Sequence, residues 1–222
     1  MHSVAPNIIN QQKFLKNIIL ISFEYPPRKL SIFCENVFNL ANYLMKKAIR
    51  VWIVTFDDWR SSIEKEKNII VNRIPNNIPN NISFFSYVMN LKMAYQSALA
   101  TIINEEEIDL IHFFDWETLP LLASWGNSFN IPLVYSTNSI QIIRDSNINP
   151  YTEGIIEIEK MAMKNFSRIY VDSESLLERI HNDYSIDKKT LRVESFSDKK
   201  YYTNIYSEYE RLIKLEAAGK KL

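Results

Sequence analysis

Glycine is scarce in this 222-residue sequence, which contains only Gly126, Gly154 and Gly219. An average composition of about 7% glycine would give roughly fifteen in a chain of this length. Glycine-rich loops bring backbone amides close to a phosphate, and they need several glycines together. The sequence therefore excludes a GxGxxG dinucleotide loop and a P-loop.

Other absences narrow the class of protein. Cys34 is the single cysteine, which excludes an intramolecular disulfide and favours a reducing, cytoplasmic compartment. The 26 Lys and Arg residues balance 26 Asp and Glu residues, so the net charge does not indicate nucleic-acid binding. No apolar run reaches the ~18 residues of a membrane span, and no signal peptide is recognisable. His2, His112 and His181 lack metal-ligand spacing, so no metal is expected, and His112 is interpreted as a hydrogen-bonded histidine in the interior or at its rim.

Apolar runs alternate with helical periodicity along the chain. Strands are expected at residues 17–23, 50–55, 69–74, 110–113, 132–136, 168–172 and 190–194. Helices are expected at residues 32–47, 84–104, 118–129, 151–165, 174–182 and 205–218. This alternation predicts a Rossmann-like, three-layer α/β/α fold with a mainly parallel sheet.

The predicted elements also suggest how the chain is organised. Residues 1–14 are expected to form a tail, 15–200 the Rossmann-like domain, and 201–222 a C-terminal helical segment. Ligands of parallel sheets bind outside the carboxyl ends of the strands. The candidate site therefore lies in the loops after Phe23, Phe113, Ser136 and Asp172.

Four segments at these loops resemble a known family. ISFEYPP at residues 21–27, followed by an amphipathic helix, resembles the opening of glycogen and starch synthases and of related retaining glycosyltransferases of family 4. The resemblance continues in DLIHFFDW at 109–116, IPLVYST at 131–137 and SRIYVDSES at 167–175. Each motif alone is weak, but the order and spacing also match, so the resemblance covers about residues 17–200.

The resemblance implies half of a two-domain enzyme. Family members have the GT-B fold, in which two Rossmann-like domains face each other across a cleft. The N-terminal domain mainly binds the acceptor and the C-terminal domain mainly binds the nucleotide sugar. This sequence resembles the acceptor-side half, expected to be inactive alone and to hold no cofactor by itself. A protein partner would complete the site for a donor of the ADP-glucose or UDP-glucose type, and a homodimer would cover the cleft face equally well.

Three departures from the family pattern bear on catalysis. The loop 27–33 lacks the glycines that meet the donor phosphates in the family, and Arg28 and Lys29 are either substitute phosphate contacts or plain loop charges. Asn138 stands where the family usually has a histidine, and asparagine cannot titrate. Ser195–Asp198 replaces the Asn-Gly turn that leads to the second domain, and the residues after it are too few for another domain.

The candidate binding residues each have a structural alternative. The resemblance implies that Asp115 and Trp116 line the cleft, whereas a helix N-cap and a core aromatic are the alternative. Asn138 either contacts a sugar or satisfies a turn. Arg144, at the end of the segment QIIR that begins with Gln141, resembles a cleft arginine of archaeal-type synthases, or is a solvated helix charge.

Other side chains have structural interpretations. Cys34 and the aromatic residues Phe84, Phe85 and Tyr87 are expected in the core, although that aromatic run is alternatively a membrane or partner surface. Ser173 is expected to cap a helix, and Glu153, Glu157 and Glu159 to favour the N-terminal half of their helix through the dipole.

Three functional hypotheses remain open. The chain is the acceptor-side part of a glycosyltransferase that works with a separate donor-binding subunit, a non-catalytic glycan-binding or regulatory domain, or a fragment of a longer product. The same fold supports each of them.

Overall fold

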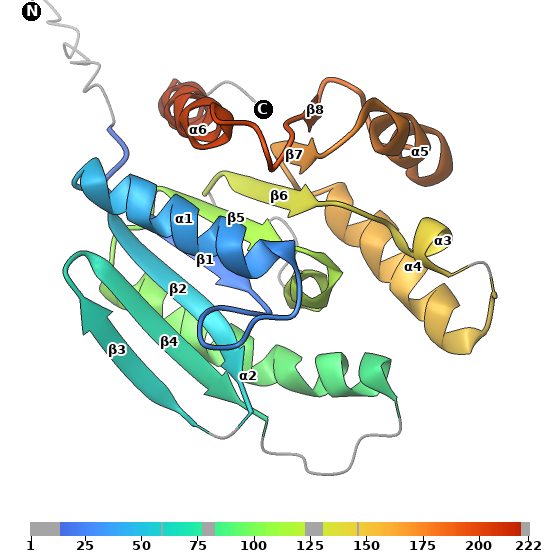
Figure 1. Cartoon of the computed structure of the whole chain (residues 1–222), viewed down its shortest axis with the longest axis horizontal. Coiled ribbons are helices and arrows are strands. Elements are labelled where there is room, and N and C mark those ends of the chain that lie inside the picture. The colour runs from blue at the N-terminus through green and yellow to red at the C-terminus, as the bar shows by residue number, and fades with distance from the viewer. Residues whose placement is uncertain (1–13, 59, 77–82, 123–130, 146, 219–222) are drawn as a thin grey trace, which may run out of the picture.

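A twisted sheet forms the middle layer of the computed structural model (Figure 1), which describes residues 14–58, 60–76, 83–122, 131–145 and 147–218. Within these ranges the sheet has eight strands in the order β3-β4-β2-β1-β5-β6-β7-β8. All neighbouring pairs are parallel except β3 and β4. The strands are β1 Asn17–Ser22, β2 Arg50–Asp57, β3 Ser62–Glu66, β4 Ile69–Pro75, β5 Leu110–Phe114, β6 Leu133–Thr137, β7 Arg168–Val171 and β8 Leu191–Val193.

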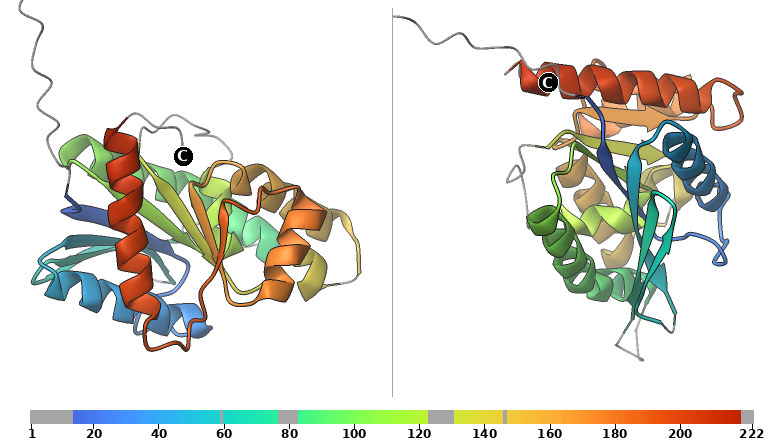
Figure 2. Two further views of the ribbon diagram at one scale, coloured as in Figure 1. Left: turned by 90° about the horizontal axis from the view of Figure 1, so that it is seen from above. Right: turned by 90° about the vertical axis from the view of Figure 1, so that its left-hand side faces the viewer.

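Helices cover both faces of the sheet. They are α1 Ile32–Lys46, α2 Phe84–Glu105, the 3₁₀ helix η1 Trp116–Leu121, α3 Gln141–Arg144, α4 Pro150–Met163, α5 Glu174–Tyr184 and α6 Tyr201–Ala217. One core cluster joins α2, η1, α4 and α5 to one sheet face, and a second joins α1 and α6 to the other. Figure 2 shows α6 lying across its face of the sheet. The predicted three-layer, mainly parallel fold is therefore confirmed.

Burial on both faces explains why the central strands are almost wholly apolar. In β1, Ile19 and Ile21 belong to one core cluster, while Ile18 and Leu20 belong to the other. Successive side chains of a strand point to opposite faces, so a strand covered on both sides needs apolar residues at every position. The apolar sequence of β1 thus agrees with its position inside the sheet, between β2 and β5.

Helix α6 is tied to the sheet by polar contacts as well as by its apolar face. His112 in β5 is fully buried, with Nδ1 against the Tyr209 hydroxyl and Nε2 2.8 Å from Ser136 Oγ. Burial holds the pKa of His112 well below its usual 6.5. The interior interpretation of His112 is confirmed, and Cys34 is likewise buried, with its Sγ donating to the Arg28 carbonyl at 3.1 Å.

Several predicted element boundaries are wrong. The edge strand β3 was not expected, because four of its five residues are exposed and it has no apolar face. The expected helix at 118–129 is a 3₁₀ helix at Trp116–Leu121 with Pro120 inside it, and residues 123–130 lie outside the described part. Helix α6 begins at Tyr201, four residues earlier than expected, and the short helix α3 was missed.

The structure also answers some smaller predictions. Ser173 caps α5, since its Oγ accepts from the Leu176 amide at 3.3 Å. The core prediction is wrong for Phe84, which is 52% exposed. No helix in the described ranges has the length and apolar character that crossing a membrane requires.

Candidate functional site

The loops that follow β1, β5 and β6 meet at one edge of the sheet. These strands are adjacent and parallel, so their carboxyl ends lie side by side. Ser22 pairs with Phe114, and Phe114 pairs with Ser136. The next residue, Asp115, donates its backbone amide to the Ser136 carbonyl at 3.0 Å. We call this edge the rim.

Asp115 has an unusual backbone at the rim. Its φ of 58° and ψ of 168° fall in a region that non-glycine residues rarely occupy, at a cost of about 1–3 kcal/mol. Its Oδ1 accepts from the Trp116 amide at 2.8 Å, and its carbonyl accepts from the Thr118 amide at 3.2 Å. The helix-cap and buried-aromatic interpretations are therefore confirmed for Asp115 and Trp116, which leaves the cleft role as a proposal. Strain of this kind is concentrated at functional sites.

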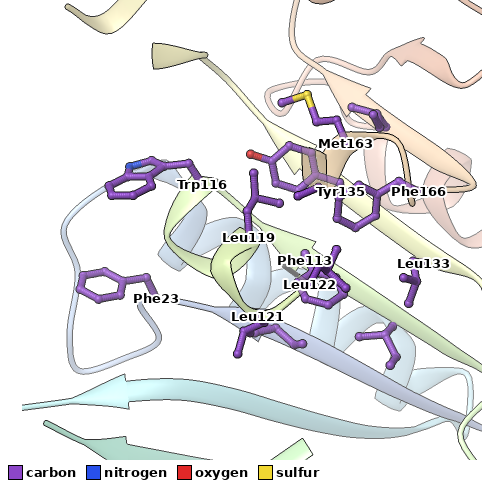
Figure 3. Close-up of a cluster of buried hydrophobic side chains, with 14 of the residues drawn as sticks. Phe23, Phe113, Trp116, Leu119, Leu121, Leu122, Leu133, Tyr135, Met163 and Phe166 are labelled. Atoms are coloured by element: carbon purple, nitrogen blue, oxygen red, sulfur yellow. The ribbon is translucent and has the colours of Figure 1, made fainter. Parts of the chain in front are cut away.

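A small cavity opens beside Asp115. Its volume is about 80 Å³, and its lining includes Glu24 and Ser31 from the loop after β1, with Asp115 and Glu117 from the loop after β5. Phe84 from α2 also lines it, and its ring packs edge-on to Trp116 with centroids 5.8 Å apart. Figure 3 shows Phe23 and Trp116 at one end of the hydrophobic cluster beneath the rim.

The carboxyl groups at this cavity hold protons more tightly than usual. Burial raises the pKa of Asp115 to about 6, against the attraction of Arg144, which lowers it. Burial, and secondarily the charge of Asp115, raises the pKa of Glu117 well above its usual value. Glu117 Oε2 is buried and has no hydrogen-bond partner in the described part of the chain. The rim thus presents one carboxyl group, Asp115, with a pKa close to neutral, and a second, Glu117, whose pKa is raised by burial.

Arg144 links these acids to the helix behind them. Its Nη2 donates to Glu159 Oε1 at 2.5 Å, its Nη1 lies 3.8 Å from Asp115 Oδ1, and its guanidinium lies 5.8 Å from the Trp116 ring centroid. Burial alone would lower the pKa of Arg144, but Glu159 and Asp115 raise it above its ordinary value. Arg144 is therefore part of an ion-pair cluster, with its side chain 25% exposed.

Glu159 anchors this cluster from inside the protein. It is fully buried in α4 and accepts hydrogen bonds from the Gln141 amide at 2.9 Å and from the Tyr184 hydroxyl. Gln141 is also buried, and its Oε1 accepts from Arg144 Nε at 3.3 Å. The hydrogen bonds of Glu159 thus hold α3 against α4, in place of the expected interaction with the helix dipole.

The Glu24 carboxylate accepts hydrogen bonds from backbone amides of the loop before α1. Its Oε2 accepts from the amides of Leu30 and of Ser31, the latter at 2.8 Å, and its Oε1 accepts from Ser31 Oγ. Ser31 in turn caps α1. Amides at a helix N-terminus attract anions, and here a carboxylate of the chain itself is the anion.

The two predicted phosphate contacts already face acidic partners. Arg28 contacts Asp58 and lies over the rings of Phe23 and Phe56, with its guanidinium 5.2 Å and 4.6 Å from their centroids. Lys29 contacts Glu35. These contacts favour the charged-loop interpretation over a phosphate site.

The structure brings some of the predicted site residues together and separates others. Asp115, Trp116, Gln141 and Arg144 form one cluster, whereas Asn138 is exposed after β6 and does not line the cavity. Sequence reasoning missed Glu24, Glu117 and Glu159. The positions of Glu24 and Glu117 just past strand ends were a usable signal, but Glu159 gave none. No group of three or more His, Cys, Asp or Glu side chains among the described residues is arranged to hold a metal ion.

Comparisons with known proteins agree with the observed fold. Residues 36–193 match the model of the family described as Glycosyltransferase Family 4. A search of curated proteins finds no match.

Among solved structures, the fold is similar to that of sucrose-phosphate synthase from Thermosynechococcus elongatus. One structure has a TM-score of 0.61 at 16% identity, over 89% of this chain and 97% of that one. A second structure of that protein has a TM-score of 0.60 at 17% identity, over 81% and 48%. The catalytic domain of starch synthase IV from Arabidopsis thaliana, bound to ADP and acarbose, gives a TM-score of 0.59 at 11% identity, over 82% and 52%. The chain spans about half the length of the last two structures, and at these identities the likeness concerns the fold alone.

Proposed function

The chain belongs to glycosyltransferase family 4, and we propose that its rim binds the acceptor sugar while a second domain holds the nucleotide sugar. The observation that carries this proposal is Asp115. A strained residue with a raised pKa sits at the carboxyl edge of a parallel sheet, beside a cavity and an ion-paired arginine. Strain, perturbed protonation and a position at this edge are each typical of a binding site.

The polar groups of the rim suit sugar hydroxyls. Asp115 and Glu117 offer carboxyl oxygens that accept from a hydroxyl when ionised and donate to one when protonated. Arg144 offers donors in a fixed position, because Glu159 and Trp116 hold its guanidinium. The apolar ring of Phe84 beside the cavity adds a surface for the carbon face of a sugar ring.

The donor is proposed to bind elsewhere. The Glu24 carboxylate already accepts from the amides that would otherwise face an anion, and its negative charge would repel a phosphate placed beside it. A donor of the ADP-glucose or UDP-glucose type would therefore depend on a second domain, from a partner chain or from a second copy in a homodimer.

Calorimetry of the purified chain tests both parts of the proposal. We expect binding of maltooligosaccharides, loss of that binding in Asp115→Ala, and no binding of ADP-glucose or UDP-glucose. Glu174→Ala is the matched control, because Glu174 is an exposed carboxylate in the first turn of α5. Tight binding of either nucleotide sugar by this chain alone would contradict the division of roles.

A non-catalytic, glycan-binding or regulatory role is the second candidate. The glycine-free loop with Glu24 in its amides favours it, as does Asn138 at the position where the family usually has a histidine. A transfer assay with a nucleotide sugar, an acceptor and a supplied donor-binding domain separates the two. The enzymatic role expects product and a higher rate for Asn138→His, whereas the regulatory role expects none from either chain.

A further inference from the structure

A second concave surface lies between α1 and the β3–β4 hairpin, and Tyr25 and Pro26 of the loop after β1 also line it. This groove has a volume of about 550 Å³, within the ~300–1,000 Å³ range of small-molecule sites. None of the rim residues Asp115, Glu117 and Arg144 lines it. Figure 1 shows α1 and the β3–β4 hairpin side by side at this end of the sheet.

Arg73 lines the groove and has one buried donor without a partner among the described residues. Its side chain is only 4% exposed, with Nε donating to Glu64 Oε1 at 2.9 Å and Nη2 donating to the Pro26 carbonyl at 2.6 Å. Its Nη1 is buried and has no acceptor among the described residues. An unsatisfied buried donor is costly, so a ligand oxygen placed there gains free energy.

The rest of the groove combines apolar surface with both kinds of polar group. Phe38 in α1 is 42% exposed, and its ring lies 6.0 Å from that of Tyr25. Burial raises the pKa of Tyr25 to about 12, so its hydroxyl remains protonated. Asn42, Glu64 and Glu66 add amide and carboxylate groups.

The charges of the groove favour a neutral ligand. Arg73 and Lys65 balance Glu64 and Glu66, and the closest pair, Arg73 and Glu64, is already joined. An anion would meet the two carboxylates and a cation would meet the buried guanidinium. A ligand with apolar faces and many uncharged hydroxyls avoids both repulsions.

We propose that this groove is a second saccharide site, which binds a neutral oligosaccharide with Phe38 against a sugar ring and Arg73 donating to a sugar oxygen. The proposal does not depend on the rim being the acceptor site. A groove of this kind holds one part of a glycan chain outside the rim cavity, and thereby raises the local concentration of its other end there.

NMR titration of the isotope-labelled chain with maltohexaose, cellohexaose and mannohexaose tests the proposal. We expect at least one of the three to shift the backbone amides of Phe38, Val71 and Arg73. Phe38→Ala should weaken that binding at least about tenfold, as expected when an aromatic packing surface is lost. Because Phe38 is exposed, this variant should keep the fold.

Two further variants separate the groove from the rim and from general effects. Phe14→Ala removes another aromatic side chain, 58% exposed, and should leave the affinity unchanged. Asp115→Ala should abolish shifts at the rim and preserve those in the groove. The proposal is overturned if none of the three sugars shifts the groove amides, if Phe38→Ala binds as the unchanged chain does, or if the shifts lie only on the outer edge of β3, as peptide addition to that strand would produce.

Discussion

Asp115→Asn is expected to stabilise the protein at neutral pH. The asparagine retains an oxygen that can accept the Trp116 amide, so the cap of η1 persists. Asparagine also tolerates a positive φ better than most residues. The substitution removes mainly the buried negative charge.

The size and sign of the effect follow from the raised pKa. The folded chain holds the Asp115 proton with a pKa of about 6, whereas the unfolded chain holds it with a pKa of about 3.9. The native state therefore binds that proton more tightly, and the stability of the unchanged protein falls as the pH rises from about 4 to 6. Two pKa units correspond to about 3 kcal/mol above pH 7, and roughly half of that remains at pH 5. The side chain is 22% exposed, so solvent screening reduces this value only modestly.

Urea unfolding of both chains at pH 8 and pH 5 measures the difference. We expect the variant to be more stable by about 2–3 kcal/mol at pH 8 and by about 1–1.5 kcal/mol at pH 5. Asp172→Asn is the control at the exposed end of β7, and it should change the stability by less than about 0.5 kcal/mol. A variant that is less stable at pH 8, or a gain that is equal at the two pH values, would refute the reasoning.

Two other substitutions test buried ionisable groups. Glu24→Ala leaves the amides of Leu30 and Ser31 without their acceptor and should cost about 1–3 kcal/mol in urea unfolding; added phosphate should then raise the unfolding midpoint of the variant and not of the unchanged chain. His112→Gln removes a histidine whose pKa is held well below 6.5 by burial. Because the unfolded chain takes up a proton there first, stability should fall by up to about 2 kcal/mol between pH 7.5 and pH 5 in the unchanged protein. The difference in unfolding free energy between the two chains should narrow over that range, and a constant difference would contradict the prediction.

The fold could be predicted from the sequence because the central strands are buried on both faces. Runs such as residues 18–21 are apolar at each position, and this pattern has few alternatives in an α/β chain. The edge strand β3 has no such apolar pattern and could not be predicted in this way, because its stability comes from pairing with β4. The 3₁₀ helix at Trp116–Leu121 was missed for a related reason, because apolar spacing does not separate a 3₁₀ helix from an α-helix.

The site is less accessible to sequence reasoning than the fold. Position after a strand end and family resemblance pointed to Asp115, and family resemblance pointed to the segment of Gln141 and Arg144. Nothing in the local sequence separated Glu159 from the exposed acids of its helix. Its burial depends on Gln141, Arg144 and Tyr184, which come from other elements. A buried carboxylate is recognisable only when its partners in space are known.

The carboxylate of Glu24 also bears on which role the rim performs. An internal anion and a donor phosphate would compete for the same amides, and the internal one sacrifices no translational freedom when it binds. Glu24 therefore binds these amides in preference to a donor phosphate unless other contacts hold the donor. Any transfer must then obtain nearly all of its donor affinity from another domain. If phosphate stabilises Glu24→Ala and leaves the unchanged chain unaffected, the loop retains the geometry of an anion site that one side chain closes. If phosphate affects neither chain, the loop geometry itself has departed from that of an anion site, and the non-catalytic role gains support.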